Sequence, residues 1–474
     1  MKGSSYAAVL GRRNDIMKAA VGMDFAQFES GALRFDYEGM MAAPGLSMAD
    51  VIGIQRRYAV GDTPLIELKN ITALARKLAP EGKGARILIK DEACNPSGSF
   101  KARRAAVSVD TAKRMGYKGV ITATSGNYGA AVACCCAKAG LQCIVVQECF
   151  DSSSAGQPEI LEKARKCEAF GAEVVQLSVG PELFYVFLRL LEETGYFNAS
   201  LYTPYAILGI ESLGFELAAQ CRQRFNRDPD LVIATNAGGG NLTGTARGLQ
   251  KANCKAPVFG ASVDLRGLHM ASDTQFNRKS FTTGHTGFGM PFAVNPDRSD
   301  VPRSAARPLR YMDKYYTVTQ GEVFYTTEML AVLEGMERGP AGNTSLAAAF
   351  SLAQTMPEDQ IIVVQETEYT GAGKHQNAQL AFARANGIDI RIGDPRQQEA
   401  GKSIILPESP AQIKAQEVDL QHLRRSFIQN ALGDKNTMPS QEDIAYLAEE
   451  IRSDEHFVKN TVRDILEGSH ETGR

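Results

Sequence analysis

Short runs of β-branched and other apolar residues alternate with longer amphipathic segments from about residue 84 to residue 365. The runs with the length and composition of buried strands are 85–90, 119–124, 142–148, 172–177, 230–235, 257–263 and 360–365. Most of them lead into glycine or a polar turn and then into a helical pattern. This order is typical of βαβ units, so the sequence predicts an α/β fold built on parallel strands.

The amphipathic segments between these runs predict helices. The candidates are 99–115, 127–139, 158–170 and 181–193, and Gly140 and Gly171 follow two of them at the position that helix ends favour. The first 60 residues are polar and mostly helical in pattern. After Gly393 the sequence is again polar, with candidate helices at 411–431, 441–452 and 456–467. Both ends are expected to pack on a central core or to contact another subunit.

The composition is that of a globular enzyme with more than one lobe. The chain has 474 residues, of which 44% are hydrophobic and 22% charged, and its formal net charge is −2. One core rarely extends over such a length, and a charge near zero gives no indication of a nucleic-acid partner. No apolar run approaches the roughly 18 residues of a membrane span, and the N-terminus lacks the apolar segment of a signal peptide. We therefore expect a cytoplasmic protein without membrane contact.

A metal site has no support in the sequence. The nine cysteines and six histidines are scattered without the spacing that metal ligands show. We expect the cysteines to be reduced thiols, as is usual in a cytoplasm, and no metal to be bound.

One lysine stands in an unusual setting, within the stretch Asn95–Arg104, whose sequence is NPSGSFKARR. Pro96 and Gly98 break regular structure, and Lys101 follows at the first turn of the expected helix. The positive end of a helix dipole favours the neutral form of an amine, and a neutral amine is a nucleophile toward an aldehyde. Most lysines are instead solvated surface charges, so this position alone is a weak signal.

Two strand-to-helix turns strengthen this interpretation of Lys101. The first is Thr124–Gly129, TSGNYG, where hydroxyls and backbone N–H groups at a helix start suit a carboxylate; an ordinary turn can have a similar sequence. The second is Asn236–Gly244, NAGGGNLTG, whose three consecutive glycines allow the backbone to approach a phosphate closely. The G-x-G-x-x-G template of dinucleotide folds fits it poorly and a P-loop lysine is absent. The loop therefore suits a lone phosphate ester.

These three elements, in this order, resemble those of the fold-type II enzymes that use pyridoxal 5'-phosphate (PLP), and of their threonine synthase branch in particular. That branch carries an N-P-[ST]-G-S-F-K motif, a T-S-G-N motif and a glycine-rich phosphate loop, and the resemblance covers roughly residues 60 to 375. It implies PLP as cofactor and a tryptophan synthase β-like fold of two domains, with parallel sheets flanked by helices. The implied parts are an N-terminal helical extension (1–60), a large PLP-binding domain (61–110 and 205–395), a small α/β domain (111–204) and a C-terminal helical extension (396–474).

The resemblance also implies a role for each matching residue. Lys101 would hold the cofactor covalently and act in catalysis, and Asn127 would bind the ring hydroxyl. The phosphate would be bound by Gly238, Gly239, Gly240, Asn241 and Thr243. The substrate carboxylate would be bound by Thr124, Ser125, Gly126 and Asn127. Thr370 would contact the pyridine nitrogen, with Thr367 as the alternative, and a neutral hydroxyl there suits chemistry at Cβ and Cγ.

The sequence departs from ordinary threonine synthases directly after the lysine. Those enzymes usually continue Lys-Asp-Arg, whereas Lys101 is followed by Ala102, Arg103 and Arg104. With its extended C-terminus and its cysteine-rich ACCCAKAG helix, the chain is most similar to the cofactor-binding β subunits of the 2-amino-4-oxopentanoate thiolases of ornithine degradation. That resemblance implies cleavage of the amino acid with coenzyme A to acetyl-CoA and alanine, in an oligomer with a small second subunit. Arg103 and Arg104 are candidate contacts for coenzyme A, although a solvated helix face is the commoner setting.

Two other functions stay open at this point. A threonine synthase or cysteate synthase would act alone on a phosphorylated amino acid. A degenerate member of the fold would be a binding or regulatory subunit, although the presence of Lys101 with both loops argues against it. The sequence shows no recognisable coenzyme A site, and the irregular region 264–320 is a candidate for loops that cover the substrate.

Overall fold

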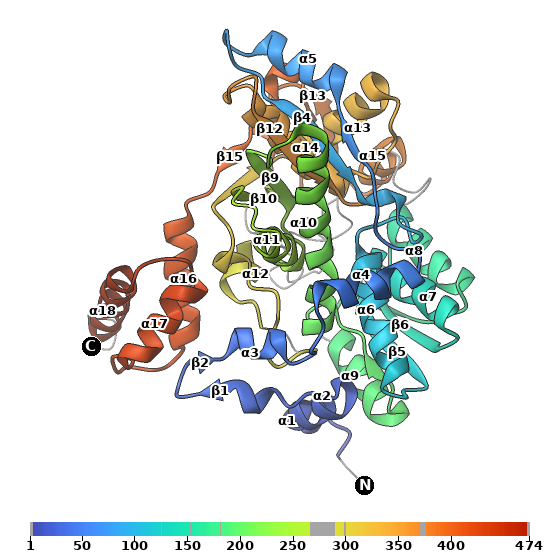
Figure 1. Cartoon of the computed structure of the whole chain (residues 1–474), viewed down its shortest axis with the longest axis vertical. Helices are drawn as coiled ribbons and strands as arrows, with labels where there is room; N and C mark the ends of the chain where they lie inside the picture. The colour runs from blue at the N-terminus through green and yellow to red at the C-terminus, as the bar shows by residue number, and fades with distance from the viewer. Residues whose placement is uncertain are drawn as a thin grey trace.

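The computed structural model describes residues 3–124, 126–150, 154–180, 182–265, 290–297, 300–369 and 376–471. Within them, two main β-sheets surrounded by helices form the body of the molecule (Figure 1). The expected α/β class is confirmed. No helix in these parts of the chain is long and apolar enough to cross a bilayer.

The larger sheet has seven strands in the order β15-β11-β10-β9-β12-β4-β3. They are β3 (Leu65–Glu67), β4 (Arg86–Asp91), β9 (Leu231–Thr235), β10 (Val258–Val263), β11 (Lys314–Val318), β12 (Ile361–Glu366) and β15 (Gln416–Glu417). The inner pairs are parallel, and the two outermost strands run antiparallel to their neighbours. In the middle, Val363 of β12 lies opposite both Val232 of β9 and Leu88 of β4. The centre of this sheet is therefore built from segments far apart in the chain.

The smaller sheet lies between β4 and β9 in the sequence. Its four strands are β5 (Gly119–Thr124), β6 (Gln142–Phe150), β7 (Glu173–Ser178) and β8 (Phe197–Asn198), and their order is β7-β6-β5-β8. All neighbouring pairs are parallel. Figure 1 shows this sheet at the lower right, beside the end of α6 and away from the larger sheet.

Helices cover and connect the two sheets. They are α5 (Lys69–Leu78), α6 (Lys101–Arg114), α7 (Asn127–Ala139), α8 (Pro158–Ala169), α9 (Glu182–Thr194), α10 (Pro204–Phe225), α11 (Gly240–Lys251), α12 (Met290–Val294), α13 (Gln320–Glu334), α14 (Pro340–Ala353) and α15 (Gln376–Ala385). Helix α6 is buried from Ala102 to Ala112.

Glycines allow α6, α10 and α11 to approach one another closely. A Cβ atom on Gly209 of α10 would lie 2.3 Å from the backbone oxygen of Arg103 in α6. Likewise, a Cβ on Gly248 of α11 would lie 1.9 Å from the backbone oxygen of Glu211 in α10. Side chains are excluded from both contacts. This packing fixes the starts of α6 and α11, where Lys101 and Gly240 stand, relative to each other.

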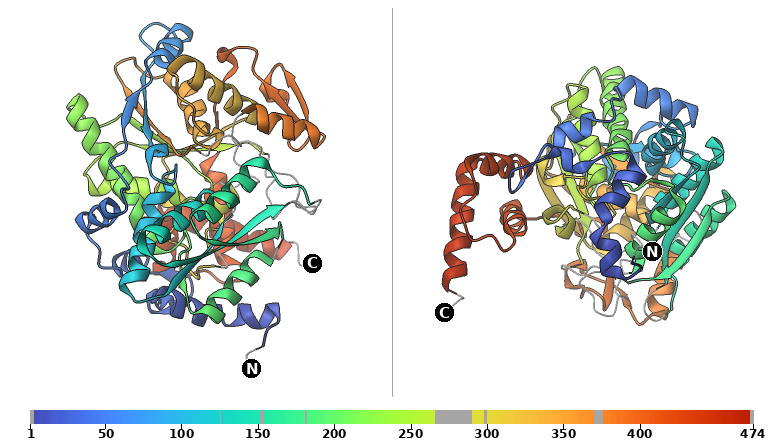
Figure 2. Two further views of the ribbon diagram at one scale, coloured as in Figure 1. Left: turned by 90° about the vertical axis from the view of Figure 1, so that its right-hand side faces the viewer. Right: turned by 90° about the horizontal axis from the view of Figure 1, so that it is seen from below.

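The two ends of the chain lie outside these sheets. The N-terminal segment contains α1 (Tyr6–Gly11), α2 (Arg13–Val21), the hairpin β1 (Glu29–Ser30) and β2 (Arg34–Phe35), α3 (Tyr37–Ala42) and α4 (Met48–Arg57). The C-terminal segment contains α16 (Leu420–Leu432), α17 (Gln441–Glu450) and α18 (Glu455–Glu471), which project to one side of the molecule (Figures 1 and 2). Before them, β13 (Asp389–Ile392) and β14 (Ser403–Leu406) form a small parallel pair.

The seven predicted strands are all present, with bounds within two residues of the prediction. The helices expected at 99–115, 127–139, 158–170 and 181–193 are α6, α7, α8 and α9. Much of the region 264–320, the candidate for substrate-covering loops, cannot be compared because residues 266–289 lie outside the described residues.

The C-terminal part, 396–474, contains three helices at the candidate positions, but the first candidate helix, 411–431, begins later than expected. This part of the chain begins with β14 and β15, and the helix expected from residue 411 starts only at Leu420. The reason is that β15 pairs with β11, where Val418 donates its backbone N–H to the carbonyl of Tyr315 at 2.8 Å. Asp419 then caps α16 by accepting a hydrogen bond from the backbone N–H of Gln421 at 2.8 Å.

Candidate active site

The turn before Lys101 is held against the segment that follows β12. The backbone N–H of Phe100 donates to the carbonyl of Thr367 at 3.0 Å, and that of Tyr369 donates to the carbonyl of Gly98 at 2.7 Å. Gly98 has a φ of +77°, and a Cβ there would lie 2.5 Å from the backbone oxygen of Tyr369. Only glycine fits this conformation and this contact. Lys101, which is half-buried, then begins α6 as expected.

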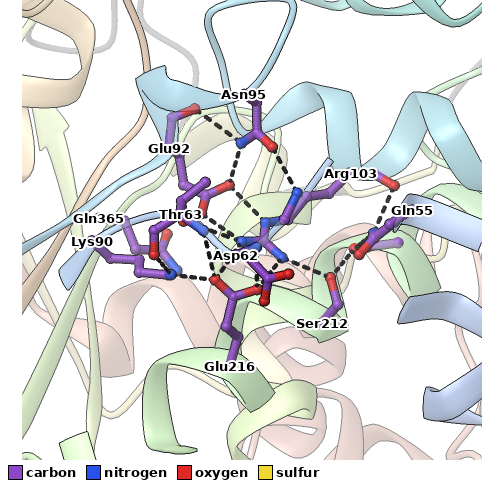
Figure 3. Close-up of polar contacts among 12 residues, drawn as sticks. Gln55, Asp62, Thr63, Lys90, Glu92, Asn95, Arg103, Ser212, Glu216 and Gln365 are labelled. Carbon is purple, nitrogen blue, oxygen red and sulfur yellow. Dashed lines mark hydrogen bonds and ion pairs between the residues drawn. The ribbon is translucent and has the colours of Figure 1, made fainter. Parts of the chain in front are cut away.

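Asn95, the first residue of the motif, connects this turn to a buried ionic cluster (Figure 3). Its Nδ2 donates to Glu92 Oε2 at 2.9 Å, and its Oδ1 accepts from the backbone N–H of Gly61 at 3.0 Å. Glu92 pairs with Arg103, whose Nε lies 2.7 Å from Glu92 Oε2. Arg103 also pairs with Glu216 at 3.1 Å, and Lys90 donates to the same carboxylate.

The charges of this cluster compensate one another. Burial alone would raise the pKa of Glu216, but Arg103 and Lys90 lower it to about 2. Although burial acts in the opposite direction, the charges of Glu92 and Glu216 hold the pKa of Arg103 above its usual value. The solvated helix face that the sequence favoured for Arg103 is wrong. Its side chain is completely buried and points toward two glutamates. It serves the fold and is not placed to contact coenzyme A.

The turn Thr124–Gly129, the candidate site for the substrate carboxylate, is called the carboxylate turn and begins where β5 ends. Thr124 Oγ1 accepts a hydrogen bond from the backbone N–H of Gly126 at 3.0 Å, and α7 starts at Asn127. Asn127 is 4% exposed, and its Nδ2 has no hydrogen-bond partner among the described residues. A Cβ on Gly126 would lie 2.9 Å from Lys163 Nζ, so the turn packs against α8. Ser125, expected in the same carboxylate site, lies outside the described residues.

The glycine loop, Asn236–Gly244, leads into a helix N-terminus, a kind of structure that binds anions. Gly239 has a φ of +81°, and its carbonyl accepts from both the N–H and the Oγ1 of Thr243, at 3.0 and 2.8 Å. Asn241 donates to the carbonyl of Thr235 at 3.3 Å. Helix α11 starts at Gly240, so the first N–H groups of a 12-residue helix have no partner within that helix.

Side chains lie close to all three glycines of the loop. A Cβ on Gly238 would lie 2.2 Å from the hydroxyl of Tyr202, and one on Gly239 would lie 2.7 Å from Pro308. A Cβ on Gly240 would lie 2.8 Å from Nη2 of Arg104. Sequence reasoning missed Tyr202 and assigned Arg104 to a different ligand, because neither residue belongs to the loop itself.

Several buried amide groups near this loop lack partners. The Oδ1 atoms of Asn236 and Asn241 accept no hydrogen bond within the described residues. Asn236 is 2% exposed. Polar atoms of this kind are costly to bury unless a ligand or water satisfies them. Asn236 was missed as a site residue, although an asparagine between a strand and three glycines is the sequence signal for it.

Only one of the two threonines that are candidates for contact with the pyridine nitrogen lies within the described residues. Thr367 is 5% exposed, and its backbone carbonyl is used by Phe100. Thr370 lies outside the described residues. Next to Thr367, Glu366 is completely buried, and both of its carboxyl oxygens lack hydrogen-bond partners in the described parts of the chain. Burial, followed by the like charges of Asp91 and Glu368, raises the pKa of Glu366 well above its usual range.

In the described ranges, no three His, Cys, Asp or Glu side chains gather as metal ligands. The candidate site combines an amine at a helix start, a helix N-terminus for a phosphate and a turn for a carboxylate. These groups can hold a phosphorylated aldehyde and an amino acid side by side.

Comparisons with known proteins agree with this chemistry. A family model described as "Pyridoxal-phosphate dependent enzyme" matches residues 56–368. The 2-amino-4-ketopentanoate thiolase beta subunit of Acetoanaerobium sticklandii is 67% identical over 465 residues, covering 98% of this chain and 99% of that protein. A protein of the same name from an unknown prokaryotic organism is 62% identical over 467 residues, again covering 98% and 99%. The crystal structure of a threonine deaminase has the same fold, with a TM-score of 0.53 and 24% identity over 68% of this chain and 98% of that chain.

Proposed function

This chain belongs to the family of pyridoxal-phosphate dependent enzymes, and we propose that it is the cofactor-binding subunit of a thiolase that cleaves 2-amino-4-ketopentanoate, also called 2-amino-4-oxopentanoate. The observation that carries this proposal is the 67% identity to a thiolase beta subunit over 98% of the chain. The match includes both terminal extensions, whereas the fold shared with the threonine deaminase covers 68% of the chain.

The residues of the site fit PLP. Lys101 at the start of α6 would form the covalent link to the aldehyde of the cofactor. The glycine loop, with Gly238, Gly239, Gly240, Asn241 and Thr243, would bind the phosphate. The unpaired Nδ2 of Asn127 would gain a partner in the ring hydroxyl, and Thr367 or Thr370 would contact the ring nitrogen. PLP bound in this way supplies an electron sink for a carbanion at Cα of an amino acid.

The protein's own groups would then direct the chemistry. Thr124, Ser125, Gly126 and Asn127 would hold the substrate carboxylate, and Lys101 would move the proton at Cα. The thiolate of coenzyme A attacks the C4 carbonyl, and the bond between C3 and C4 breaks. Acetyl-CoA leaves, the electron pair stays on C3, and protonation of C3 and Cα yields alanine.

The same proposal divides the work between two domains. The large domain, 61–110 and 205–395, contains Lys101 and the glycine loop, and the small domain, 111–204, contains the carboxylate turn. We further propose that a small second subunit supplies part of the coenzyme A site, since the closely similar proteins are named beta subunits. We also propose a cytoplasmic location and a role in ornithine degradation.

The test is acetyl-CoA formation by the purified, PLP-loaded chain given 2-amino-4-ketopentanoate and coenzyme A, with and without the small second subunit. We expect acetyl-CoA and alanine in equal amounts when both subunits are present. Turnover of phosphohomoserine or phosphoserine by the chain alone would instead identify a threonine synthase or cysteate synthase. PLP binding without turnover of any of these substrates, with both subunits present, would refute the thiolase.

A further inference from the structure

Arg104 is the second of the two consecutive arginines in α6, and it faces the glycine loop. We propose that Arg104 binds the phosphate of the cofactor, so that its guanidinium supplies the positive charge of a site otherwise built from backbone N–H groups. This inference rests on the proposed function only in requiring that the chain binds PLP.

The charge of Arg104 has no counter-charge within the part of the chain that the structure describes. The residue is 3% exposed, and its Nη1 donates to the backbone carbonyl of Leu201 at 3.1 Å. Its Nε is buried without a hydrogen-bond partner among the described residues, and no described carboxylate pairs with it. Burial lowers the pKa of Arg104 to about 10, against a smaller opposing effect of Tyr128 and Tyr202. A buried cation of this kind is costly unless an anion joins it.

Arg103 shows that burial without a partner is not a general property of this helix. Arg103 is also buried, but Glu92 and Glu216 neutralise it. Successive residues of an α-helix point about 100° apart, so the two guanidinium groups reach different surroundings. Arg103 reaches two glutamates, and Arg104 reaches the start of α11. The contrast indicates that the partner of Arg104 is a ligand.

The guanidinium lies against the start of α11, whose first N–H groups suit a phosphate. Its Nη2 and Nη1 atoms lie 2.8 and 3.0 Å from the position that a Cβ on Gly240 would occupy. The carbon at the centre of the guanidinium also lies 5.3 Å from the centre of the Phe100 ring, which favours a fixed orientation. The N-terminus of α11 and a planar guanidinium can then bind different oxygens of one phosphate.

The test compares PLP with pyridoxal, which lacks the phosphate, in binding to the apoprotein. We would replace Arg104 by methionine, which keeps its length but not its charge, and by lysine, which keeps the charge but not the fork. The matched control is Arg114→Met, because Arg114 lies in the same helix with a side chain that is 52% exposed. Dissociation constants are measured by fluorescence titration, after circular dichroism has shown that each variant is folded.

For Arg104→Met we expect PLP to bind about 30-fold more weakly and pyridoxal to bind with nearly unchanged affinity, since one charged contact is lost. Arg104→Lys should lie between the wild type and the methionine variant, and Arg114→Met should match the wild type. Equal weakening of PLP and pyridoxal, or no weakening of PLP, would overturn the proposal. If Arg104→Met does not fold, the lysine variant decides by the same comparison of the two ligands.

Other anions share this chemistry, and the experiment separates them. The KM for coenzyme A and the KM for the amino acid are measured with saturating PLP in the wild type and in Arg104→Lys. We expect both to stay within about twofold of the wild type. A raised KM for coenzyme A or for the amino acid, with unchanged PLP affinity, would assign Arg104 to that anion and refute our proposal. Failure of the wild-type chain to bind PLP would refute the proposed function itself.

Discussion

Lys166 of α8 donates a hydrogen bond from Nζ to the backbone carbonyl of Ser97 at 2.7 Å, and so connects the small sheet's helix to the turn before Lys101. The same helix places Lys163 against Gly126 of the carboxylate turn. Helix α8 therefore contacts both the turn before Lys101 and the carboxylate turn, and so positions these two parts of the candidate site.

Replacing Lys166 by methionine should loosen the turn before Lys101. The carbonyl of Ser97 loses its charged donor, which costs about 1–3 kcal/mol of unfolding free energy. Lys138→Met is the matched control, because Lys138 donates in the same way to the carbonyl of Tyr58, at 2.6 Å and away from the site. Urea unfolding should show similar losses for both variants. Only Lys166→Met should lower kcat and weaken PLP binding; equal effects of the two variants on kcat would contradict this role.

Replacing Lys101 by alanine should abolish turnover without abolishing cofactor binding. The proposed covalent link and proton carrier would be lost, whereas the glycine loop at the start of α11 would be unchanged. We expect PLP to remain bound but to be removed by dialysis, with a fall in kcat of more than about 1,000-fold. Lys77→Ala, on an exposed part of α5, should behave as the wild type. Substantial activity in Lys101→Ala would refute the proposed mechanism.

Glu366 should make the folded protein sensitive to rising pH. Its pKa is raised by burial and then by like charges, so the unfolded chain releases the proton at lower pH than the folded chain does. The stability that depends on Glu366 is lost as the pH rises from the usual pKa of a glutamate toward the raised pKa of the folded state. Glu366→Gln keeps the shape of the side chain without its titratable proton, so the stability of this variant relative to the wild type should increase as the pH rises above 4.5.

Urea unfolding at several pH values measures this difference, with the exposed Glu337→Gln as control. A glutamine variant that becomes less stable relative to the wild type with rising pH would show that Glu366 is ionised. The comparison is made with and without PLP, because Glu366 lies beside Thr367 of the candidate site.

Glu216 should make the protein sensitive to acid. Its pKa is about 2 in the folded state and 4.5 ordinarily, a difference worth about 3 kcal/mol at neutral pH. That contribution is fully present above pH 4.5 and is lost as the pH falls toward 2. Glu216→Gln should therefore be less stable at pH 7 by about 3 kcal/mol or more, since Arg103 and Lys90 lose a partner. Unfolding curves of the two proteins should converge in acid; a constant difference would contradict the assignment.

Glu450 should connect the C-terminal extension to cofactor binding. It is 1% exposed and pairs with Arg310 at 2.5 Å and with Arg307 at 3.4 Å. The backbone N–H of Arg307 in turn donates to Oγ1 of Thr243 in the glycine loop, at 3.0 Å. Glu450→Gln removes a negative charge beside two buried arginines. We therefore expect the free energy of unfolding to fall by about 3 kcal/mol and PLP to bind several-fold more weakly.

The neighbouring Glu449 provides the control for this variant. Glu449 also contacts Arg310, but its side chain is 64% exposed, so Glu449→Gln should change stability by less than about 1 kcal/mol. PLP titration and thermal unfolding measure both variants. An unchanged PLP affinity in Glu450→Gln would show that the C-terminal extension does not influence cofactor binding.

The sequence predicted the elements whose signal is local. Strand β5 is a continuous apolar run, and α7 ends at Gly140 in the left-handed conformation, so both have the predicted bounds. Strand β14 was missed because it is short, with four residues paired to β13. Strand β15 was missed because it has only two residues and depends on a distant partner: Gln416 lies opposite Thr317 of β11. Pairing across such a separation leaves no periodic pattern in the segment itself.

The parts of the candidate site that belong to a local sequence motif could be predicted. Contacts with residues far away in the chain could not. The structure places Lys101, the carboxylate turn and the glycine loop at helix starts, as the glycines and hydroxyls of these motifs predicted. The setting of Arg103 was not, because Glu216 joins it from a helix more than a hundred residues later in the chain. The same is true of Arg104, whose position over Gly240 depends on the close packing of α6, α10 and α11.

The position of β12 between β4 and β9 has a consequence for biosynthesis. A nascent chain that has reached residue 355 has made β4, β9, β10 and β11, but the strand that joins β4 to the others has not been made. Until Ile361–Glu366 leaves the ribosome, β4 and β9 each present an unpaired apolar edge, which favours aggregation. We expect ribosome-bound fragments of this length to bind chaperones, and the large sheet to close only late in synthesis.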